Sequence, residues 1–176
     1  HTQRRRQRQM CIRDSTTGAV MTPIVLASTF EQSSPGVHKG YDYSRSINPT
    51  REAFENCIAS LENGVKGYGF SSGVAAISAC IELLSPGDHV IAMDDLYGGS
   101  VRLFNEIKTI SQGIEVSYVD MTNVDNIKAN LKENTKMVFV ETPTNPLLKI
   151  ADLSKIAKLA KANKILTVCD NTFASP

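Results

Sequence analysis

The chain has 176 residues, 41% of them hydrophobic, and its 19 basic and 18 acidic residues give a formal net charge of +1. That length suffices for one medium-sized domain with a buried core, and no apolar run approaches the ~20 residues of a membrane-spanning helix. The three histidines and four cysteines are scattered and form no CxxC pair, which argues against a structural zinc site and predicts no bound metal. Apolar neighbours of Cys57, Cys80 and Cys169 predict buried thiols in a reducing cytoplasm.

The first fifteen residues hold an uneven share of the charge, with five Arg and one Asp. Such a basic segment is compatible with nucleic-acid binding or with a transit peptide. Its sequence also resembles translated vector sequence, and we interpret residues 1–15 as non-native and exclude them from the fold prediction. Residues 16–176 hold 14 basic and 17 acidic residues, so nothing else in the chain indicates a nucleic-acid partner.

Residues 16–50 differ from the rest of the chain. They include Pro23, Pro35 and Gly36 and show no long hydrophobic period. We therefore expect an extended N-terminal arm that packs on something other than its own core.

Helix-like and strand-like patterns alternate from about Thr50 onward. They predict helices over residues 51–63, 73–84, 100–110, 123–132 and 152–163, and strands over residues 65–70, 89–93, 115–119, 136–141 and 165–170. Asn48 and Pro49 suit the start of the first helix, and Gly64 suits its end. This alternation predicts an α/β fold for residues 51–176, with a mainly parallel sheet, helices on both faces and a buried last strand.

The segments that follow four of the predicted strands are rich in Ser, Gly, Asp, Tyr, Asn and Thr. They read SSGVAAI, DDLYGG, ETPTNP and DNTFASP. Each has an ordinary structural explanation as a turn or a helix cap. Because ligands of open α/β sheets bind beyond the carboxyl ends of the strands, the four segments together favour a ligand site.

Ser72 and Gly73 open a predicted helix, where unpaired amides and the helix dipole favour an anion such as a phosphate. The chain has no GxxxxGK[ST] motif, which excludes a P-loop nucleotide site. Gly67, Gly69 and Ser72 nearly match the dinucleotide-binding pattern, with Asp94 about 20 residues on. However, both glycines fall inside the predicted strand rather than in the turn after it, so we keep a dinucleotide-binding domain only as an alternative.

The remaining polar groups suit a phosphorylated aromatic cofactor. Tyr97 lies beside two glycines, which would let its ring stand over a flat ligand. Asp170 ends a strand and could pair with a ring nitrogen, and a carboxylate there raises the pKa of a pyridine nitrogen. A protonated pyridine is the electron sink of pyridoxal 5'-phosphate (PLP) chemistry.

Five segments, YDYSRSINPTR, FSSGVAAI, MDDLYGGS, VETPTNPLLKI and DNTFASP, resemble the Cys/Met-metabolism PLP enzymes in order and spacing. The similarity covers about residues 21–176. The resemblance implies the aspartate-aminotransferase type of PLP fold (fold type I), here a truncated large domain, and a homotetramer of close dimers.

The resemblance also implies roles for individual residues, which can be given in chain order. Tyr43 and Arg45 match residues that reach the cofactor phosphate of the neighbouring subunit, which makes the arm an inter-subunit element. Gly73 and Val74, next to Ser72, match the amides that bind the phosphate. The other matches are Tyr97, which stacks on the ring; Asn145, near the cofactor oxygen and the substrate carboxylate; Asp170, the partner of the pyridine nitrogen; and its neighbour Thr172.

Two departures stand out. Ile47 lies where the family usually has a glycine or another small or polar residue. The family's cofactor-binding lysine follows DNTFxSP, and no lysine of this chain matches it. We therefore expect an N-terminal fragment that is inactive by itself.

For the longer parent, the resemblance implies a cytoplasmic transsulfuration enzyme that acts at the γ-carbon of a sulfur amino acid, with no membrane partner. Cystathionine γ-lyase is the first choice, which would form cysteine, 2-oxobutanoate and ammonia. Cystathionine γ-synthase is the next alternative, followed by methionine γ-lyase and O-acyl-homoserine sulfhydrylase.

Overall fold

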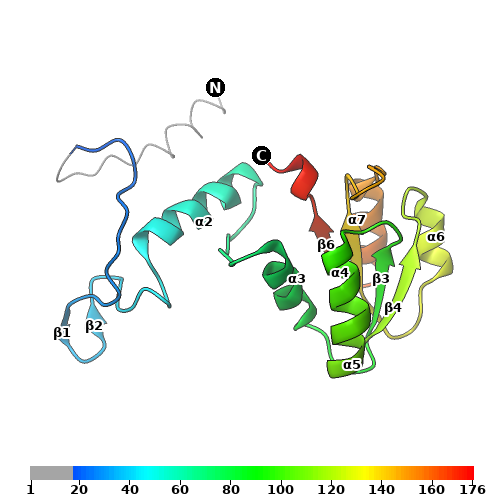
Figure 1. Ribbon diagram of the computed structural model, residues 1–176, viewed down its shortest axis with the longest axis horizontal. Coiled ribbons are helices and arrows are strands. Elements are labelled where there is room, and N and C mark those ends of the chain that lie inside the picture. The colour runs from blue at the N-terminus through cyan, green and yellow to red at the C-terminus, as the bar shows by residue number, and fades with distance from the viewer. Residues whose placement is uncertain (1–17) are drawn as a thin grey trace. The chain divides into compact units, whose positions relative to one another are not determined.

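The computed structural model describes residues 18–176 and divides the chain into two compact units (Figure 1). Of the described residues, 18–69 and Pro176 form the first unit, and Phe70–Ser175 form the second. The interpretation of residues 1–15 as non-native lies outside the described residues.

The first unit carries the arm and one helix. Two short strands, β1 (Gln32–Ser34) and β2 (Val37–His38), pair antiparallel within the otherwise irregular arm, and the helix α2 spans Pro49–Leu61. As predicted, Asn48 caps α2, because its side chain accepts hydrogen bonds from the amides of Thr50 (2.9 Å) and Arg51 (3.3 Å). The residue with left-handed backbone after the helix is Asn63 (φ 53°), not the predicted Gly64.

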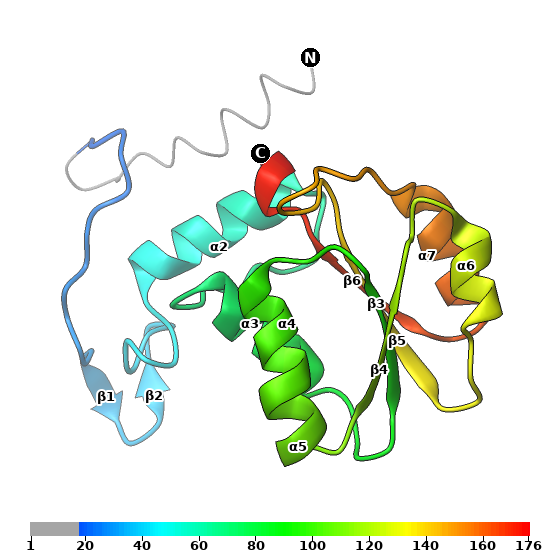
Figure 2. The same ribbon diagram turned by 45° about the vertical axis from the view of Figure 1, so that its right-hand side comes forward.

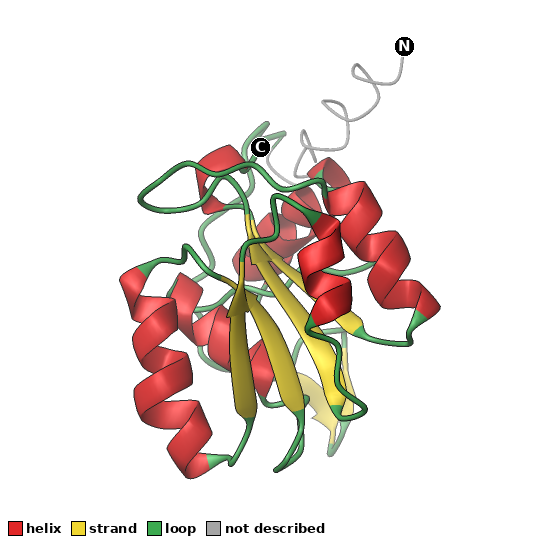
Figure 3. Cartoon of the chain, turned by 90° about the vertical axis from the view of Figure 1, so that its right-hand side faces the viewer, coloured by secondary structure: helices red, strands yellow, loops and turns green. Residues whose placement is uncertain are grey.

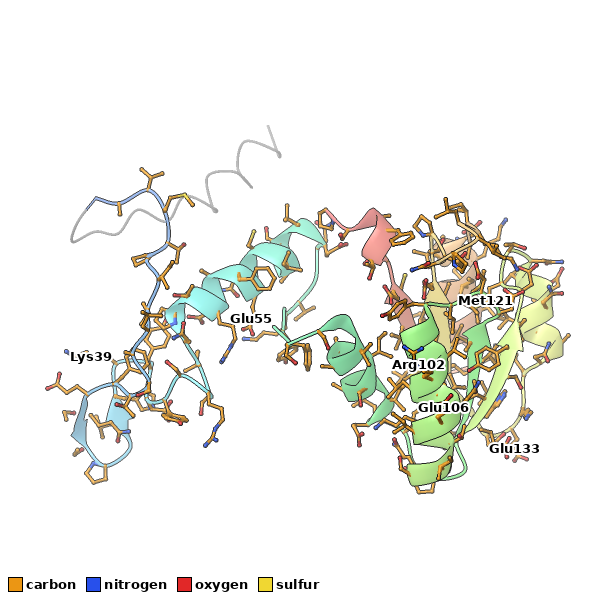
Figure 4. The ribbon with its side chains drawn as sticks, in the orientation of Figure 1. Lys39, Glu55, Arg102, Glu106, Met121 and Glu133 are labelled. Atoms are coloured by element: carbon orange, nitrogen blue, oxygen red, sulfur yellow. The ribbon has the colours of Figure 1, made fainter. Side chains whose placement is uncertain are left out.

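The predicted strand over residues 65–70 is wrong, because these residues are irregular. The amide of Gly69 donates to Oε1 of Glu55 at 2.9 Å, and Glu55 is labelled on α2 in Figure 4. A Cβ on Gly67 would overlap the backbone carbonyl of Glu55, so Gly67 is needed for close approach to α2. The glycines therefore pack a loop against a helix, and the strand that a dinucleotide-binding turn requires is missing here.

The second unit is an α/β layer structure, as predicted. Its four strands, β3 (His89–Met93), β4 (Glu115–Val119), β5 (Thr135–Glu141) and β6 (Leu166–Asp170), are all parallel in the order β4-β3-β5-β6. The helical segments are α3 (Gly73–Ile81), α4 (Gly98–Arg102), α5 (Thr109–Ser111), α6 (Val124–Ala129), α7 (Leu153–Ala162) and the 3-10 turn Thr172–Ala174. A π-helical segment, Leu103–Lys108, joins α4 to α5 and was not predicted.

Helices cover both faces of this sheet. In Figure 2, α3, α4 and α5 lie on one side and α6 and α7 on the other, and Figure 3 shows the strands between them. The central strand β3 is buried along its whole length. The rings of Phe104 and Phe139 meet edge to face with centroids 5.2 Å apart, which joins the helical layer to β5.

The prediction of a buried last strand is wrong for β6. Leu166 is 47% exposed and Cys169 is exposed, because β6 is the edge strand of the described sheet. Among residues 18–176, no helix is long and apolar enough to cross a bilayer. The same residues contain no group of three His, Cys, Asp or Glu side chains arranged to hold a metal ion.

His89 lies fully buried at the amino end of β3. Its Nδ1 is 2.8 Å from Oγ1 of Thr135, and its Nε2 is 2.9 Å from Oγ of Ser117, so one imidazole links three neighbouring strands. Burial lowers the pKa of His89, and the positive charge of Lys132 lowers it further.

We therefore expect acid to destabilise the protein through His89. With a lowered pKa in the folded state, the unfolded chain binds more protons, so His89 contributes stability above its unfolded pKa of about 6.5 that is lost as pH falls. Urea unfolding between about pH 5 and 7.5 should show this loss, and His89→Asn should reduce the slope. An equal slope in the variant would assign the acid sensitivity to other groups.

Candidate active site

Acidic residues gather where the strands of the second unit end. Asp94 follows β3, Asp120 follows β4, and Glu141 and Asp170 are the last residues of β5 and β6. Glu141 and Asp170 are register partners in the parallel pair β5–β6. The loop after β3 leads to a helix on one face and the loop after β5 to a helix on the other (Figure 2), which is the usual position of a ligand site in this architecture.

The start of α3 offers backbone donors. The Ser72 side chain accepts the amide of Ala75 at 3.1 Å, and the Ser72 carbonyl accepts the amide of Ala76 at 3.1 Å. These bonds leave the amides of Gly73 and Val74 for an external acceptor. A Cβ on Gly73 would meet no atom within 4 Å, so an anion can approach the backbone here.

Tyr97 stands at the N-terminus of α4 with its side chain half exposed. A Cβ on Gly99 would overlap its ring, whereas a Cβ on Gly98 would meet nothing within 4 Å. The sequence suggested that the two glycines beside Tyr97 leave room for its ring, and the structure shows that Gly99 does so.

Glu141 is the most buried carboxylate at this edge, with 4% of its surface exposed. Its Oε2 accepts the amide of Tyr97 at 3.0 Å, and its Oε1 accepts the amide of Asn145 at 2.8 Å. Burial raises the pKa of Glu141; the two amides oppose this shift, and the negative charges of Asp170 and Asp95 add to it. One buried side chain thus joins the backbones of two predicted site residues.

Further bonds join the loop 94–97 to the loop 142–149. Oδ2 of Asp95 accepts from the Thr144 hydroxyl and, at 3.0 Å, from the amide of Leu147. Lys149 donates to both carboxylate oxygens of Asp94, at 2.7 and 3.0 Å. The backbone that carries Asn145 is therefore attached to the loop after β3 at several points.

Asp170 is only partly buried. Its Oδ1 accepts from the amide of Thr172 at 3.1 Å and from the Thr172 hydroxyl at 2.6 Å. These bonds form a local turn at the end of β6.

Tyr43 and Arg45 lie together in the first unit. The guanidinium carbon of Arg45 is 5.1 Å from the centroid of the Tyr43 ring, a cation–π contact. Arg51 of α2 donates to the carbonyls of Ser44 (3.0 Å) and Ser46 (2.8 Å), which holds the turn around Arg45. Ile47 belongs to the same turn, and its amide donates to the Tyr43 carbonyl at 3.0 Å.

The structure brings Tyr97, Asn145 and Asp170 to one edge, joined through the end of β5. Sequence reasoning missed Glu141, Asp95 and Lys149, although the first two belong to the quoted segments ETPTNP and DDLYGG. For Glu141, the available signal was an acidic residue at the end of a predicted strand, a position where solvent normally surrounds the side chain. The burial of Glu141 and its two amide partners depend on loops that the sequence pattern does not place.

The family model of Cys/Met metabolism PLP-dependent enzymes matches residues 7–176. The chain belongs to this family. The family's cofactor is PLP, as predicted, and the recognition of the family from five segments is confirmed.

Relatives of this family resemble the chain closely. It is 56% identical over 163 residues to cystathionine beta-lyase of Coxiella burnetii and 47% identical to cystathionine gamma-lyase of Bacillus subtilis, covering 93% of this chain each time. The crystal structure of cystathionine gamma-lyase from Lactobacillus plantarum complexed with L-serine has a TM-score of 0.90 at 45% identity and covers 97% of this chain. This similarity confirms the predicted PLP fold.

The chain spans less than half of these relatives. It covers 42% of the Coxiella and 45% of the Lactobacillus protein.

Gly99→Ala tests the position of the Tyr97 ring in the whole protein. The added Cβ should displace the ring and weaken PLP binding by about two- to tenfold, the range expected for a lost aromatic contact. Folding stability should not fall, because alanine favours a helix over glycine. Gly98→Ala is the matched control, since its Cβ meets open space. Equal PLP dissociation constants for both variants would contradict the assignment.

Proposed function

We propose that the whole protein is a PLP-dependent enzyme that cleaves a carbon–sulfur bond of cystathionine. One observation carries this proposal: Tyr97, Asn145 and Asp170 lie at the same edge of the sheet and are linked there by Glu141. The chain that carries this edge belongs to the Cys/Met metabolism PLP-dependent enzymes. The names of the relatives support cystathionine as the substrate.

The donors and acceptors of the second unit fit the cofactor. The amides of Gly73 and Val74, with Ser72 beside them, would hold its phosphate, since small residues and a helix N-terminus suit that group. The ring of Tyr97 would stack on the cofactor ring. Oδ2 of Asp170 would face the pyridine nitrogen, while Oδ1 stays bonded to Thr172.

When bound, PLP supplies an electron sink for the negative charge that develops at the α-carbon of the substrate. Asp170 keeps a proton on the pyridine nitrogen, because its negative charge raises the pKa of that nitrogen. Because the Tyr97 side chain is half exposed, its hydroxyl could exchange a proton with a substrate group. Asn145 offers a side-chain amide to the substrate carboxylate. These roles fall to residues at or after the ends of three strands, β3, β5 and β6.

Two bonds of cystathionine are candidates for cleavage. The sequence segments favoured the γ-lyase reaction, which forms cysteine, 2-oxobutanoate and ammonia. The 56% identity to a β-lyase, against 47% to a γ-lyase, favours β-cleavage, which forms homocysteine and pyruvate with ammonia. Identification of the keto acid formed from cystathionine by the whole protein decides between them. Absence of both keto acids would contradict the proposed function.

The proposal includes the predicted assembly and location. We place the protein in the cytoplasm as a homotetramer of close dimers, with Tyr43 and Arg45 of one subunit directed at the cofactor phosphate of its neighbour. Exposed apolar side chains of the arm, among them Met21 and Leu26, support contact with another chain. Light scattering of the whole protein tests the tetramer.

Asp170→Asn should leave the fold intact and largely abolish turnover. Asparagine can keep the bonds to Thr172 through its amide oxygen, but it carries no charge to hold the proton on the pyridine nitrogen. The barrier to removal of the α-proton should rise by several kcal/mol, where each ~1.4 kcal/mol is tenfold in rate. Deuterium exchange at the α-carbon measures this step. Asp152→Asn, a change at the cap of α7, is the control. Wild-type exchange in PLP-loaded Asp170→Asn protein would refute the role.

Arg45→Ala should weaken PLP binding in the whole protein by about ten- to a hundredfold, because a hydrogen bond to a charged group is worth roughly 1.5–3 kcal/mol. Lys39→Ala removes an exposed positive charge from the same arm and serves as the control; Lys39 is labelled in Figure 4. Mixed dimers test the neighbour's site: if the Arg45→Ala subunit loses its own PLP while its wild-type partner keeps PLP, the inter-subunit assignment is wrong.

A further inference from the structure

Glu141 occupies an unusual position for an acid. It is almost fully buried beside two other carboxylates, and that environment disfavours its charge. A buried carboxylate in such a place needs compensation from hydrogen bonds. Two backbone amides supply that compensation: the amide of Tyr97 donates to Oε2, and the amide of Asn145 donates to Oε1.

The two bonds use both oxygens of one carboxyl group. A glutamic acid side chain offers acceptor capacity at both oxygens, whereas a glutamine offers a single carbonyl oxygen and presents an NH2 donor on the other side. Two amides that point at different atoms therefore cannot both be satisfied by a glutamine without a change of geometry.

The bonds fix backbone atoms of residues that carry the proposed cofactor contacts. Each donor is the residue's own amide, so the bond restrains the point from which the Tyr97 or Asn145 side chain departs. Glu141 is also the register partner of Asp170, and the next amide in β5, that of Thr142, donates to the Asp170 carbonyl at 3.0 Å. Two proposed cofactor residues thus bond to the Glu141 side chain, and the third, Asp170, is paired with Glu141 through the backbone of the sheet.

We infer that Glu141 is a positioning residue, whose two carboxylate oxygens hold Tyr97 and Asn145 in register with Asp170. This inference rests on the proposed function, because it concerns the same site. Glu141 does not itself touch the cofactor or substrate in this proposal. It acts through the backbone of the two loops.

The test compares two amide-for-acid changes in the whole protein. Glu141→Gln leaves one acceptor for two donors. Asp95→Asn is the matched control, because both donors to Asp95 use the same oxygen, Oδ2, which an amide oxygen can replace. Both variants remove one negative charge from the same edge.

The first measurement is hydrogen–deuterium exchange of the backbone amides without cofactor. In Glu141→Gln, the amide of Tyr97 or Asn145 should exchange about tenfold faster or more, the consequence of losing a bond to a charged group. Asp95→Asn should leave both amides as protected as in the wild type. Unchanged protection of both amides in Glu141→Gln would overturn the inference, as would absence of protection in the wild type.

The second measurement is the induced circular dichroism of bound PLP, which reports a fixed orientation of the cofactor. Glu141→Gln should lose part of this signal and show a lower kcat, and Asp95→Asn should keep the signal. Faster amide exchange with an unchanged PLP signal would make Glu141 a loop contact only and would overturn the positioning role. If Glu141→Gln does not fold, Glu141→Asp decides by the same criteria, because its shorter side chain keeps the charge but cannot span both amides.

Failure of the inference is distinguishable from failure of the proposed function. Wild-type protein that releases no keto acid from cystathionine contradicts the function. Amide protection and the PLP signal are measured without cystathionine, so they decide the role of Glu141 separately.

Discussion

The parallel alignment of four strands is the constraint on which the second unit depends. Because β3, β4, β5 and β6 point the same way, every strand ends at the same edge, and the residues that follow them meet there. The two inner strands of the sheet, β3 and β5, are buried between two helical layers almost along their whole length. The parallel alignment also brings the polar backbone groups of the strand ends and several carboxylates close together. These groups need hydrogen-bond partners, which the loops at this edge must provide.

The carboxylates at this edge have different partners according to how far they lie from solvent. Asp94 and Asp120 lie at the more exposed side, where Lys149 pairs with the first at 2.7 Å and approaches the second at 3.7 Å. Their attraction raises the pKa of Lys149. Glu141, farther inside, is compensated by backbone amides instead. Lys149 thus pairs with the outer carboxylates, whereas two backbone amides donate to the inner one, Glu141. Hydrogen bonds are directional, so these amides orient the Glu141 side chain.

Errors in the sequence prediction have physical causes that a local pattern does not contain. Residues 65–70 alternate like a strand, but Gly67 lies there because a loop must approach the backbone of α2. The apolar segment of β6 looked buried, yet an edge strand exposes one side whatever its composition. The π-helical segment Leu103–Lys108 has no sequence signature, since it depends on how the helix packs.

From residue 73 onward the sequence alone determined the order of helices and strands, because hydrophobic period and capping residues such as Ser72 are local properties. It also singled out Tyr97, Asn145 and Asp170 as candidate site residues, since each lies in a recognisable segment directly after or at the end of a strand. Only the tertiary structure shows the contacts of Glu141. Its two hydrogen bonds join residues 44 and 4 positions away, and a pairing between loops is fixed by the register of the sheet, which no local pattern specifies.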